Sequence, residues 1–588
     1  MCIFANAYVY VQCCVYMSFF KMFAHNCCVC ALCRMISKAV NLGADPLSLL
    51  RPPDVHSPAS VRSDAAYSPG SSDLGRSCSK LTSSFVFVEK SSPALCRQAT
   101  VVTQPVVMDL LPNEEKQALM YNVSYCGDDV YTLFVSNYRI MLIPPTEAIP
   151  ELEIPLTSIL DIKEKRLQNN FLNLDIKTKD CRFFQFVCSS PVSVLKLLNE
   201  LVFGKHFFAD LQHSTNVPDA VHVNVSEFER MSLCERFELN TTINRDFLLC
   251  ETYPRVLVFP KNVSEEVLFG SAKFRDKSRL PVFSYVGGGG AIFRSSQPKS
   301  SILNRSVHDE TLMKLMNIEY IIDCRPMLNA YANIANGAGV ESLGNYHSGI
   351  ELWFASIPNI HTVRDSWEKM FLLSQQLPTT GWYTGLEQTG WYDHISLVLR
   401  ASSVLMDQVT KGKNVLCRCS HGLDRTPQVV SLAMLGLDPY YRTIQGFATL
   451  IQKEWISMGH RFATRFSLGT SPTDETSPIF FQFLESVFQL MTQNPTAFQF
   501  NEDYLVAILH QGVLSCRFDT FLYDCEKDGF EKKSKKNECW DTIWQHCHLF
   551  TNRSYINQID DNPLTIEFHI SQMRIFTNIW LKTKRTRI

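Results

Sequence analysis

Residues Asn414–Gln428 read NVLCRCSHGLDRTPQ, and this stretch decides the fold. A short apolar strand runs into Cys419, five loop residues that include Gly422 follow, and Arg425 opens an apolar helical run that extends to Leu437. A strand, a tight loop and a helix in this order are typical of an α/β protein whose site lies at the end of the strand. The sequence therefore predicts an α/β core with Cys419 between strand and helix.

The residue types of this loop fit the chemistry of phosphate esters. Successive backbone N–H groups and the start of a helix attract an anion. The same positive field favours the thiolate form of Cys419, which is the nucleophile in cysteine-dependent catalysis. The guanidinium fork of Arg425 matches two phosphate oxygens and holds them into the transition state. We therefore expect hydrolysis through a cysteinyl-phosphate.

The spacing of cysteine and arginine alone has little specificity. Cys28 with Arg34 and Cys547 with Arg553 have the same spacing, but neither pair encloses a glycine or lies between a strand and a helix. A buried structural cysteine is the alternative reading of Cys419, because most free cysteines are buried. The complete strand, glycine and helix context favours catalysis.

Two further loop residues have alternative readings. Asp424 is placed to give a proton to a leaving alkoxide, and it is equally suited to a salt bridge or a helix N-cap. His421 adds positive charge near the phosphate or is a solvated loop residue, and its partial charge at neutral pH favours the second reading.

The loop resembles that of the myotubularin family of phosphoinositide phosphatases, and further similarities extend from about residue 104 to 580. They occur in one order along the chain, which makes coincidence implausible. The similar segments are residues 250–254 (CETYP), 274–281 (FRDKSRLP), 296–298 (SQP), 323–326 (DCRP), 329–333 (NAYAN), 359–364 (NIHTVR), 437–444 (LDPYYRTI), 453–462 (KEWISMGHRF) and 498–502 (FQFNE).

The resemblance implies removal of the 3-phosphate from phosphatidylinositol 3-phosphate and phosphatidylinositol 3,5-bisphosphate, without a metal or other cofactor. It makes Cys419 the nucleophile, Arg425 the phosphate clamp and Asp424 the general acid. Arg461 and Arg465, four residues apart, match arginines that face the inositol phosphates, and without the resemblance they read as surface charge. The other expected substrate-binding residues are Asn333, Asn359, Ile360, Ser420, His421, Gly422 and Leu423.

The chain departs from the family pattern at three positions. His421 replaces an aspartate, Leu423 replaces a tryptophan, and Asn336 stands where a lysine is expected. Sac-type phosphoinositide phosphatases have a loop that ends Leu-Asp-Arg-Thr, which is similar to residues 423–426. Both Cys419 and Arg425 are present, so we expect activity. The alternatives are an inactive phosphoinositide-binding scaffold of the same family and a protein phosphatase.

Composition limits the other possibilities. The 588 residues are 46% hydrophobic, which suits a chain with large cores, and the net charge of −2 argues against a nucleic-acid partner. Cysteines beyond residue 33 lack disulfide-like spacing, as in a reducing cytosol. The resemblance implies a cytoplasmic protein in peripheral contact with endosomal membranes, and homo- or hetero-oligomers with family members.

The sequence divides into three parts. Residues 1–103 are expected to form a disordered extension and a Ser/Pro-rich linker. Residues 104–210 alternate between apolar and polar side chains in short runs and end in a helix-like run, which resembles the antiparallel β-barrel of a PH-GRAM domain. Residues 211–588 interleave strand and helix patterns and are expected to form the phosphatase domain, with a tyrosine-phosphatase-like core.

Overall fold

The computed structural model describes most of the chain after residue 113. The described ranges are 114–125, 130–145, 150–167, 171–189, 194–204, 220–233, 235–300, 305–332, 339–376, 379–516, 518–531, 539–557 and 562–581. The predicted extension and linker at residues 1–103 lie outside these ranges, as do Asn333 and Asn336. No helix within the described ranges is long and apolar enough to span a membrane.

The first described part is a seven-stranded antiparallel sheet, here called the N-terminal sheet, in the order β4-β3-β2-β1-β7-β6-β5. Its elements are β1 Lys116–Tyr125, β2 Val130–Ser136, β3 Arg139–Ile143, β4 Leu152–Pro155, β5 Ile159–Arg166, β6 Phe171–Thr178, β7 Phe183–Ser189 and the helix α3 Leu195–Phe203. Along β6 every second side chain is buried, as the period of a strand requires. The antiparallel strands predicted for residues 104–210 are therefore present.

A second sheet of five strands, the central sheet, follows in the order β10-β11-β14-β12-β13. Its strands are β10 Val282–Gly287, β11 Gly290–Ser295, β12 Tyr320–Asp323, β13 Glu351–Phe354 and β14 Asn414–Arg418, and a separate pair is formed by β8 Phe237–Asn240 and β9 Leu257–Pro260. β14 runs parallel to β11 and β12, so Ser295, Asp323 and Arg418 end at one edge. Cys419 follows directly at that edge.

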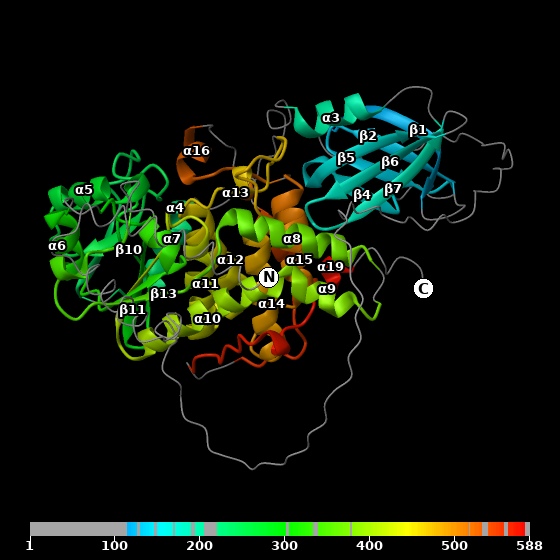
Figure 1. Cartoon of the computed structure of the whole chain (residues 1–588). Coiled ribbons are helices and arrows are strands. Elements are labelled where there is room, and N and C mark those ends of the chain that lie inside the picture. Colours follow the sequence, from blue (N-terminus) through cyan, green and yellow to red (C-terminus); the bar gives the residue numbers. More distant parts are fainter. Residues whose placement is uncertain are drawn as a thin grey trace, which may run out of the picture. The chain divides into compact units, whose positions relative to one another are not determined.

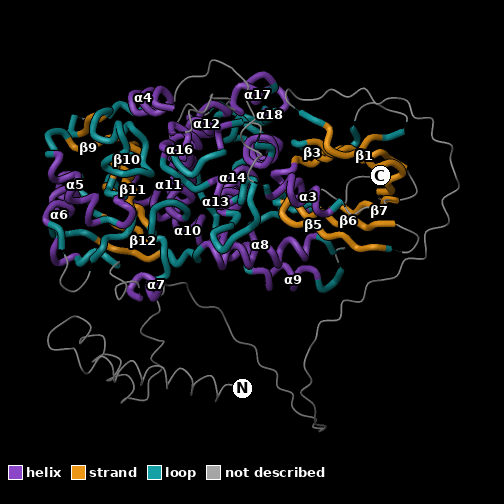
Figure 2. Tube along the Cα trace, turned by 90° about the horizontal axis from the view of Figure 1, so that it is seen from above, coloured by secondary structure: helices purple, strands orange, loops and turns teal. Residues whose placement is uncertain are grey.

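Helices cover both faces of the central sheet. In Figures 1 and 2 the sheet lies between α5 and α6 on one side and α10 and α11 on the other. The helices after the N-terminal sheet are α4 Ala220–Arg230, α5 Glu265–Phe274, α6 Val307–Leu315, α7 Met327–Ala332, α8 Ile360–Ser374, α9 Trp382–Thr389, α10 Trp391–Thr410, α11 Arg425–Leu437, α12 Ile444–Ile451, α13 Phe462–Arg465, α14 Ile479–Gln493, α15 Glu502–Ala507, α16 Glu526–Glu531, α17 Cys539–Gln545, α18 Cys547–Phe550 and α19 Thr577–Trp580. Two π-helices, η8 Gln452–Ser457 and η9 Ile508–Leu514, continue α12 and α15.

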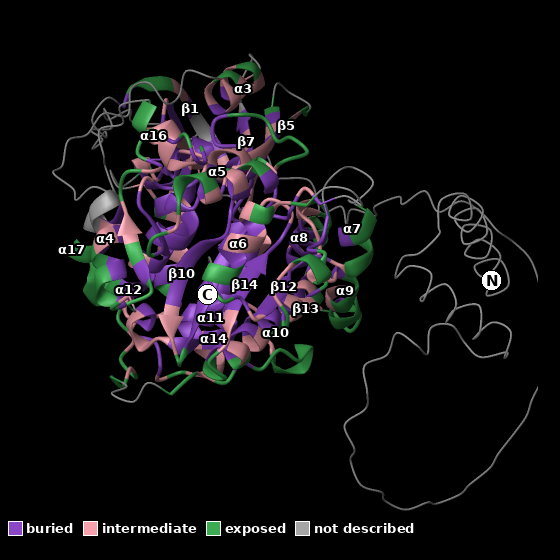
Figure 3. Cartoon of the chain, turned by 90° about the vertical axis from the view of Figure 1, so that its left-hand side faces the viewer, coloured by how far each residue is buried: buried purple, intermediate pink, exposed green. Residues whose placement is uncertain are grey.

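The core of this part forms around α11 and α14, which Figure 3 colours as buried. Every residue of α11 after Arg425 is buried. A helix that is apolar on all sides belongs inside a large domain, and α11 meets this condition. Trp382, Trp391 and Trp455 are buried in this core.

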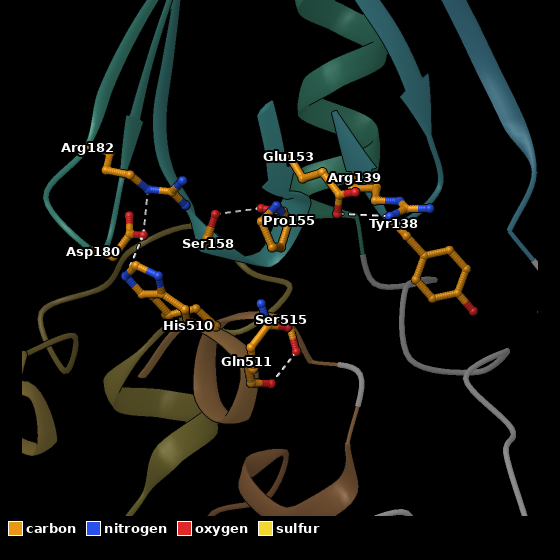
Figure 4. Close-up of a pocket in the computed structure, with 11 residues that line it drawn as sticks. Tyr138, Arg139, Glu153, Pro155, Ser158, Asp180, Arg182, His510, Gln511 and Ser515 are labelled. Atoms are coloured by element: carbon orange, nitrogen blue, oxygen red, sulfur yellow. Dashed lines mark hydrogen bonds and ion pairs between the residues drawn. The ribbon is translucent and has the colours of Figure 1, made fainter. Parts of the chain in front are cut away.

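A junction connects the N-terminal sheet with η9 and the loop after α13. Lys179 donates hydrogen bonds to the backbone carbonyls of Thr157 and Ser467, at 2.7 and 3.2 Å. A small pocket of about 260 Å³ lies beside this contact, and Figure 4 shows its lining. Its Asp180 pairs with both Arg182 (2.7 Å) and His510 (3.0 Å). The pocket is therefore a polar junction with internally paired charges.

Candidate active site

The predicted nucleophile lies at the carboxyl end of the central strand of the central sheet. Cys419 is 3% exposed, and the backbone N–H of Gly422 donates to its Sγ at 3.2 Å. Gly422 has a φ of 72°, and a Cβ there would lie 2.6 Å from the carbonyl oxygen of Ser295. Only glycine fits both conditions, because a side chain would be strained and would collide with β11. The glycine thus turns an amide toward the sulfur, as the sequence predicted.

The environment of Cys419 favours its thiolate form. Burial alone would raise the pKa of the thiol, but the charge of Arg425 and interactions with the hydroxyl and N–H of Thr426 outweigh it. Together they lower the pKa to about 7. A large fraction of Cys419 is consequently ionised at neutral pH, as a nucleophilic cysteine requires.

Arg425 is held in place by two neutral oxygen atoms. Its Nη1 donates to the carbonyl of Ile357 at 3.2 Å, and its Nη2 donates to the Ser420 hydroxyl at 3.3 Å. Neither partner is a carboxylate, so the positive charge of the guanidinium remains available for an anion at the loop.

Two buried arginines brace the loop from behind. The carbonyl oxygen of Gly422 accepts hydrogen bonds from Arg279 Nη2 (3.2 Å) and Arg294 Nη2 (2.9 Å). Arg294 is itself paired with Glu454 at 2.8 Å. A further brace is His460, whose Nδ1 lies 2.8 Å from the carbonyl oxygen of Leu423. Burial lowers the pKa of His460 to about 4, so the ring is neutral and Nδ1 carries the donated proton.

Asp424 forms a salt bridge. Arg465 donates from Nε to Oδ1 at 2.9 Å and from Nη2 to Oδ2 at 3.0 Å. Burial would raise the pKa of Asp424, but Arg465, with smaller contributions from His460 and Arg425, holds it well below its usual value. Asp424 occupies the N-cap position of α11, but its carboxylate makes the salt bridge in place of a capping hydrogen bond.

Arg461 and Arg465 lie beside each other, as predicted. Arg465 ends the short helix α13 and is 3% exposed, whereas Arg461 precedes the helix and is 29% exposed. Both contact one oxygen of Glu475, at 2.6 Å from Arg461 and 3.0 Å from Arg465. Arg461 also lies 3.4 Å from Asp524. The reading of these arginines as ordinary surface charge is wrong for the buried Arg465.

The chain is similar to known phosphatases well beyond the loop. Residues 206–529 match the model of the myotubularin-like phosphatase domain. The chain is 37% identical to Xenopus laevis myotubularin over 475 residues. The aligned region covers 75% of this chain and 78% of the relative. The chain belongs to the myotubularin-related family. It is also 41% identical over 346 residues to mouse phosphatidylinositol-3,5-bisphosphate 3-phosphatase MTMR6, and 40% identical over 348 residues to human phosphatidylinositol-3-phosphate phosphatase MTMR7. These two matches cover 55% and 52% of the relatives.

The motifs that resembled myotubularins form a buried ion network under the loop. Three arginines alternate with three carboxylates, and all six side chains are buried. Arg418 lies 2.8 Å from Asp323, Arg325 lies 2.8 Å from Asp323, and Arg275 lies 2.7 Å from Asp309. Glu341 pairs with both Arg275 and Arg418. These motifs therefore support the strand and loop that carry Cys419.

His421, which departs from the myotubularin pattern, lies beside an acidic residue. His421 Nε2 lies 3.3 Å from Asp276 Oδ2, and the His421 side chain is 42% exposed. Burial would raise the pKa of Asp276, but hydrogen bonding and charge from His421 lower it. A carboxylate is thus held next to the loop by a segment distant in sequence. Leu423, the other described departure, is buried.

Two of the remaining predicted substrate residues, Asn359 and Ile360, lie at the start of α8. Asn359 caps α8, and its Oδ1 accepts from the N–H of Thr362 at 3.0 Å. The carbonyl of Ile360 accepts from the Ser477 hydroxyl at 2.7 Å, close in sequence to Glu475. Asn333 is outside the described residues. Within the described ranges, no cluster of His, Cys, Asp or Glu is arranged to hold a metal ion.

Proposed function

We propose that this chain is a phosphoinositide 3-phosphatase that hydrolyses the D3 phosphate of phosphatidylinositol 3-phosphate and phosphatidylinositol 3,5-bisphosphate. One observation supports this above the others: Cys419 Sγ accepts from the N–H of Gly422 in a loop that ends at Arg425, and the described hydrogen bonds of Arg425 go to neutral oxygens. The relatives named for these two reactions share about 40% identity with the chain.

In the first step, the Cys419 thiolate attacks the phosphorus atom of the D3 phosphate. The new S–P bond forms as the P–O bond to the inositol ring breaks, and the departing oxygen takes up a proton. Arg425 and the amides of the loop stabilise the charge on the three transferred oxygens. The braces from Arg279, Arg294 and His460 hold the loop in this conformation.

In the second step, water attacks the cysteinyl-phosphate, and the S–P bond breaks to release phosphate and the thiolate. The ionised Asp424 is suited to accept the proton of this water. For Asp424 to supply the proton of the first step, its bond to Arg465 has to weaken, because that bond holds its pKa low. An anionic group of the headgroup that takes over Arg465, such as the phosphodiester that both lipids share, would have this effect.

The lipid substrate is favoured over phosphotyrosine by Arg461 and Arg465. They are two cations beyond the one that clamps the transferred phosphate. An inositol phosphate can engage them, whereas a phosphotyrosine has a single phosphate.

The N-terminal sheet and α3 support a PH-GRAM-like domain at residues 104–210, before a phosphatase domain at 211–588. We further propose that the protein is cytoplasmic and contacts endosomal membranes peripherally, because its substrate is a membrane lipid, and that it associates with other family members. Flotation with vesicles that contain phosphatidylinositol 3-phosphate tests the membrane contact.

Phosphate release from short-chain phosphatidylinositol 3-phosphate tests the function, with phosphatidylinositol 3,5-bisphosphate and a phosphotyrosine peptide alongside. We expect release from both lipids by the wild-type protein and none by Cys419→Ser. Release from the peptide alone would indicate a protein phosphatase. Lipid binding without release would indicate an inactive scaffold.

A further inference from the structure

The side chain of Glu475 occupies the two arginines that face the substrate in family members. Its Oε2 accepts from Arg461 Nη1 at 2.6 Å and from Arg465 Nη1 at 3.0 Å. Its backbone carbonyl accepts a further hydrogen bond from Arg465 at 2.9 Å. Glu475 is 51% exposed, whereas Arg465 is 3% exposed, so the carboxylate lies on the solvent side of the buried arginine.

The turn that carries Glu475 is anchored by contacts that do not involve its side chain. Arg364 donates to the carbonyl of Thr473 at 3.1 Å, and the N–H of Thr473 donates to Thr476 Oγ1 at 2.9 Å. Ser477 holds the end of the turn through Ile360. These contacts fix the turn and so the position of the Glu475 carboxylate. A change of the Glu475 side chain to an amide leaves these anchors intact.

The two arginines already have three carboxylate partners without a ligand. Arg465 is paired with Asp424, Arg461 with Asp524, and Glu475 adds a third carboxylate to the two cations. The pKa of Glu475 lies below its usual value, chiefly because Arg465 donates to it, with Arg461 and Lys277 contributing. It is thus an anion at neutral pH.

This anion affects the two proposed substrates differently. The phosphate to be removed binds at Cys419 and Arg425, whereas Glu475 contacts Arg461 and Arg465. A second ring phosphate that binds Arg461 and Arg465 has to displace the carboxylate or bear its repulsion. We propose that Glu475 is a specificity-determining residue, whose carboxylate occupies the donors needed by a second ring phosphate and so favours headgroups whose only phosphomonoester is the one that is removed. This inference rests on the proposed function.

The direct test compares kcat/KM for short-chain phosphatidylinositol 3,5-bisphosphate and phosphatidylinositol 3-phosphate in the full chain. Glu475→Gln is expected to raise the ratio of the two values about fivefold to tenfold, because it removes one half-exposed charge beside the second phosphate. The increase should shrink at high salt, which screens the repulsion.

Asp474→Asn is the matched control. Asp474 is exposed, precedes Glu475, and contacts Arg364 through its backbone carbonyl. Its substitution removes the same charge from the same turn, and we expect the ratio to stay within about twofold of the wild type. If Glu475→Gln and Asp474→Asn raise the ratio of kcat/KM values equally, the effect comes from general surface charge, and the proposal is overturned.

A binding measurement separates this inference from the proposed function. Calorimetry with the Cys419→Ser chain measures the affinities for inositol 1,3-bisphosphate and inositol 1,3,5-trisphosphate, with and without Glu475→Gln. A selective gain for the trisphosphate supports the inference even if the wild-type protein releases no phosphate. An equal loss of affinity for both ligands would mean that Glu475 positions the arginines, and this would overturn it.

Discussion

Arg465 holds Asp424 with two hydrogen bonds, at 2.9 and 3.0 Å, and both side chains are largely buried. The pair joins the loop that carries the nucleophile to the helix α13. It also keeps the pKa of Asp424 low, so the carboxylate is ionised in the free protein. The protonation state of the proposed acid, Asp424, thus depends on Arg465, which lies 41 positions away in the sequence.

The strength of this pair is testable by a double-mutant cycle. With Asp424→Asn and Arg465→Met, we expect a coupling in the free energy of unfolding of about 2–5 kcal/mol, because either single change leaves a buried charge without its partner. The more exposed pair of Arg461 and Asp524 is the control, with an expected coupling of about 1 kcal/mol or less. Similar coupling in both cycles, measured by urea unfolding, would refute the structural role of the buried pair.

The reactivity of Cys419 should follow its lowered pKa. Alkylation by iodoacetamide, followed by peptide mass analysis, is expected to rise with pH around a midpoint near 7. Arg425→Ala should move the midpoint upward, because the charge that favours the thiolate is lost. Cys525, whose pKa burial raises to about 11, is the internal comparison and should react slowly at pH 7. If Arg425→Ala leaves the midpoint of Cys419 alkylation unchanged, the electrostatic account is contradicted.

Gly422 should tolerate no side chain. Gly422→Ala adds a Cβ 2.6 Å from the Ser295 carbonyl oxygen, so the loop has to shift, and we expect at least about a hundredfold loss of phosphate release. Gly412→Ala is matched, since Gly412 also has a positive φ (83°) but its Cβ would lie 3.7 Å from its nearest neighbour. Both variants bear a cost of about 1–2 kcal/mol for the left-handed backbone. Equal activity in the two variants would count against the close approach as the cause.

A buried glutamate far from the loop should make stability depend on pH. Burial raises the pKa of Glu485 to about 7, against hydrogen bonds from Trp391 and Trp580 that lower it. The folded state therefore binds the proton more tightly than the unfolded state, and this contribution is fully present below pH ~4 and lost as pH rises to ~7.

Replacement of this residue isolates its contribution. Between pH 5 and pH 8, wild type should lose about 2–3 kcal/mol of unfolding free energy relative to Glu485→Gln, whose amide stays neutral. Urea unfolding of both proteins at the two pH values measures this difference, and other titrating groups cancel. Parallel pH profiles would show that Glu485 does not titrate in this range.

Local patterns predicted the elements and the loop well. The strands at Val130–Ser136, Arg139–Ile143 and Tyr320–Asp323 form where the sequence has a short apolar or alternating run between turn residues. The helix after the loop likewise extends to Leu437. Residue type, spacing and one glycine were sufficient to predict that Cys419 and Arg425 flank a tight loop between a strand and a helix.

The partners of the loop residues were not predictable in this way. Arg279, Arg294 and Glu475 come from other segments, and no local pattern signals that they meet the loop. The motif at 323–326 contained a signal, since Asp323 and Arg325 follow an apolar run, and charged residues in apolar surroundings indicate buried pairs. The sequence alone did not indicate which charges pair, and therefore left both the ionised state of Asp424 and the role of Glu475 open.

The covalent intermediate tests the central claim most directly. The full chain is mixed with short-chain phosphatidylinositol 3-phosphate, quenched in acid within a single turnover, and the mass of the peptide that carries Cys419 is measured. The account predicts a transient gain of one phosphoryl group on Cys419, which is absent in Cys419→Ser and accumulates if Asp424→Asn slows the second step. Release of phosphate without phosphorylated Cys419, or at an undiminished rate by Cys419→Ser, would contradict it.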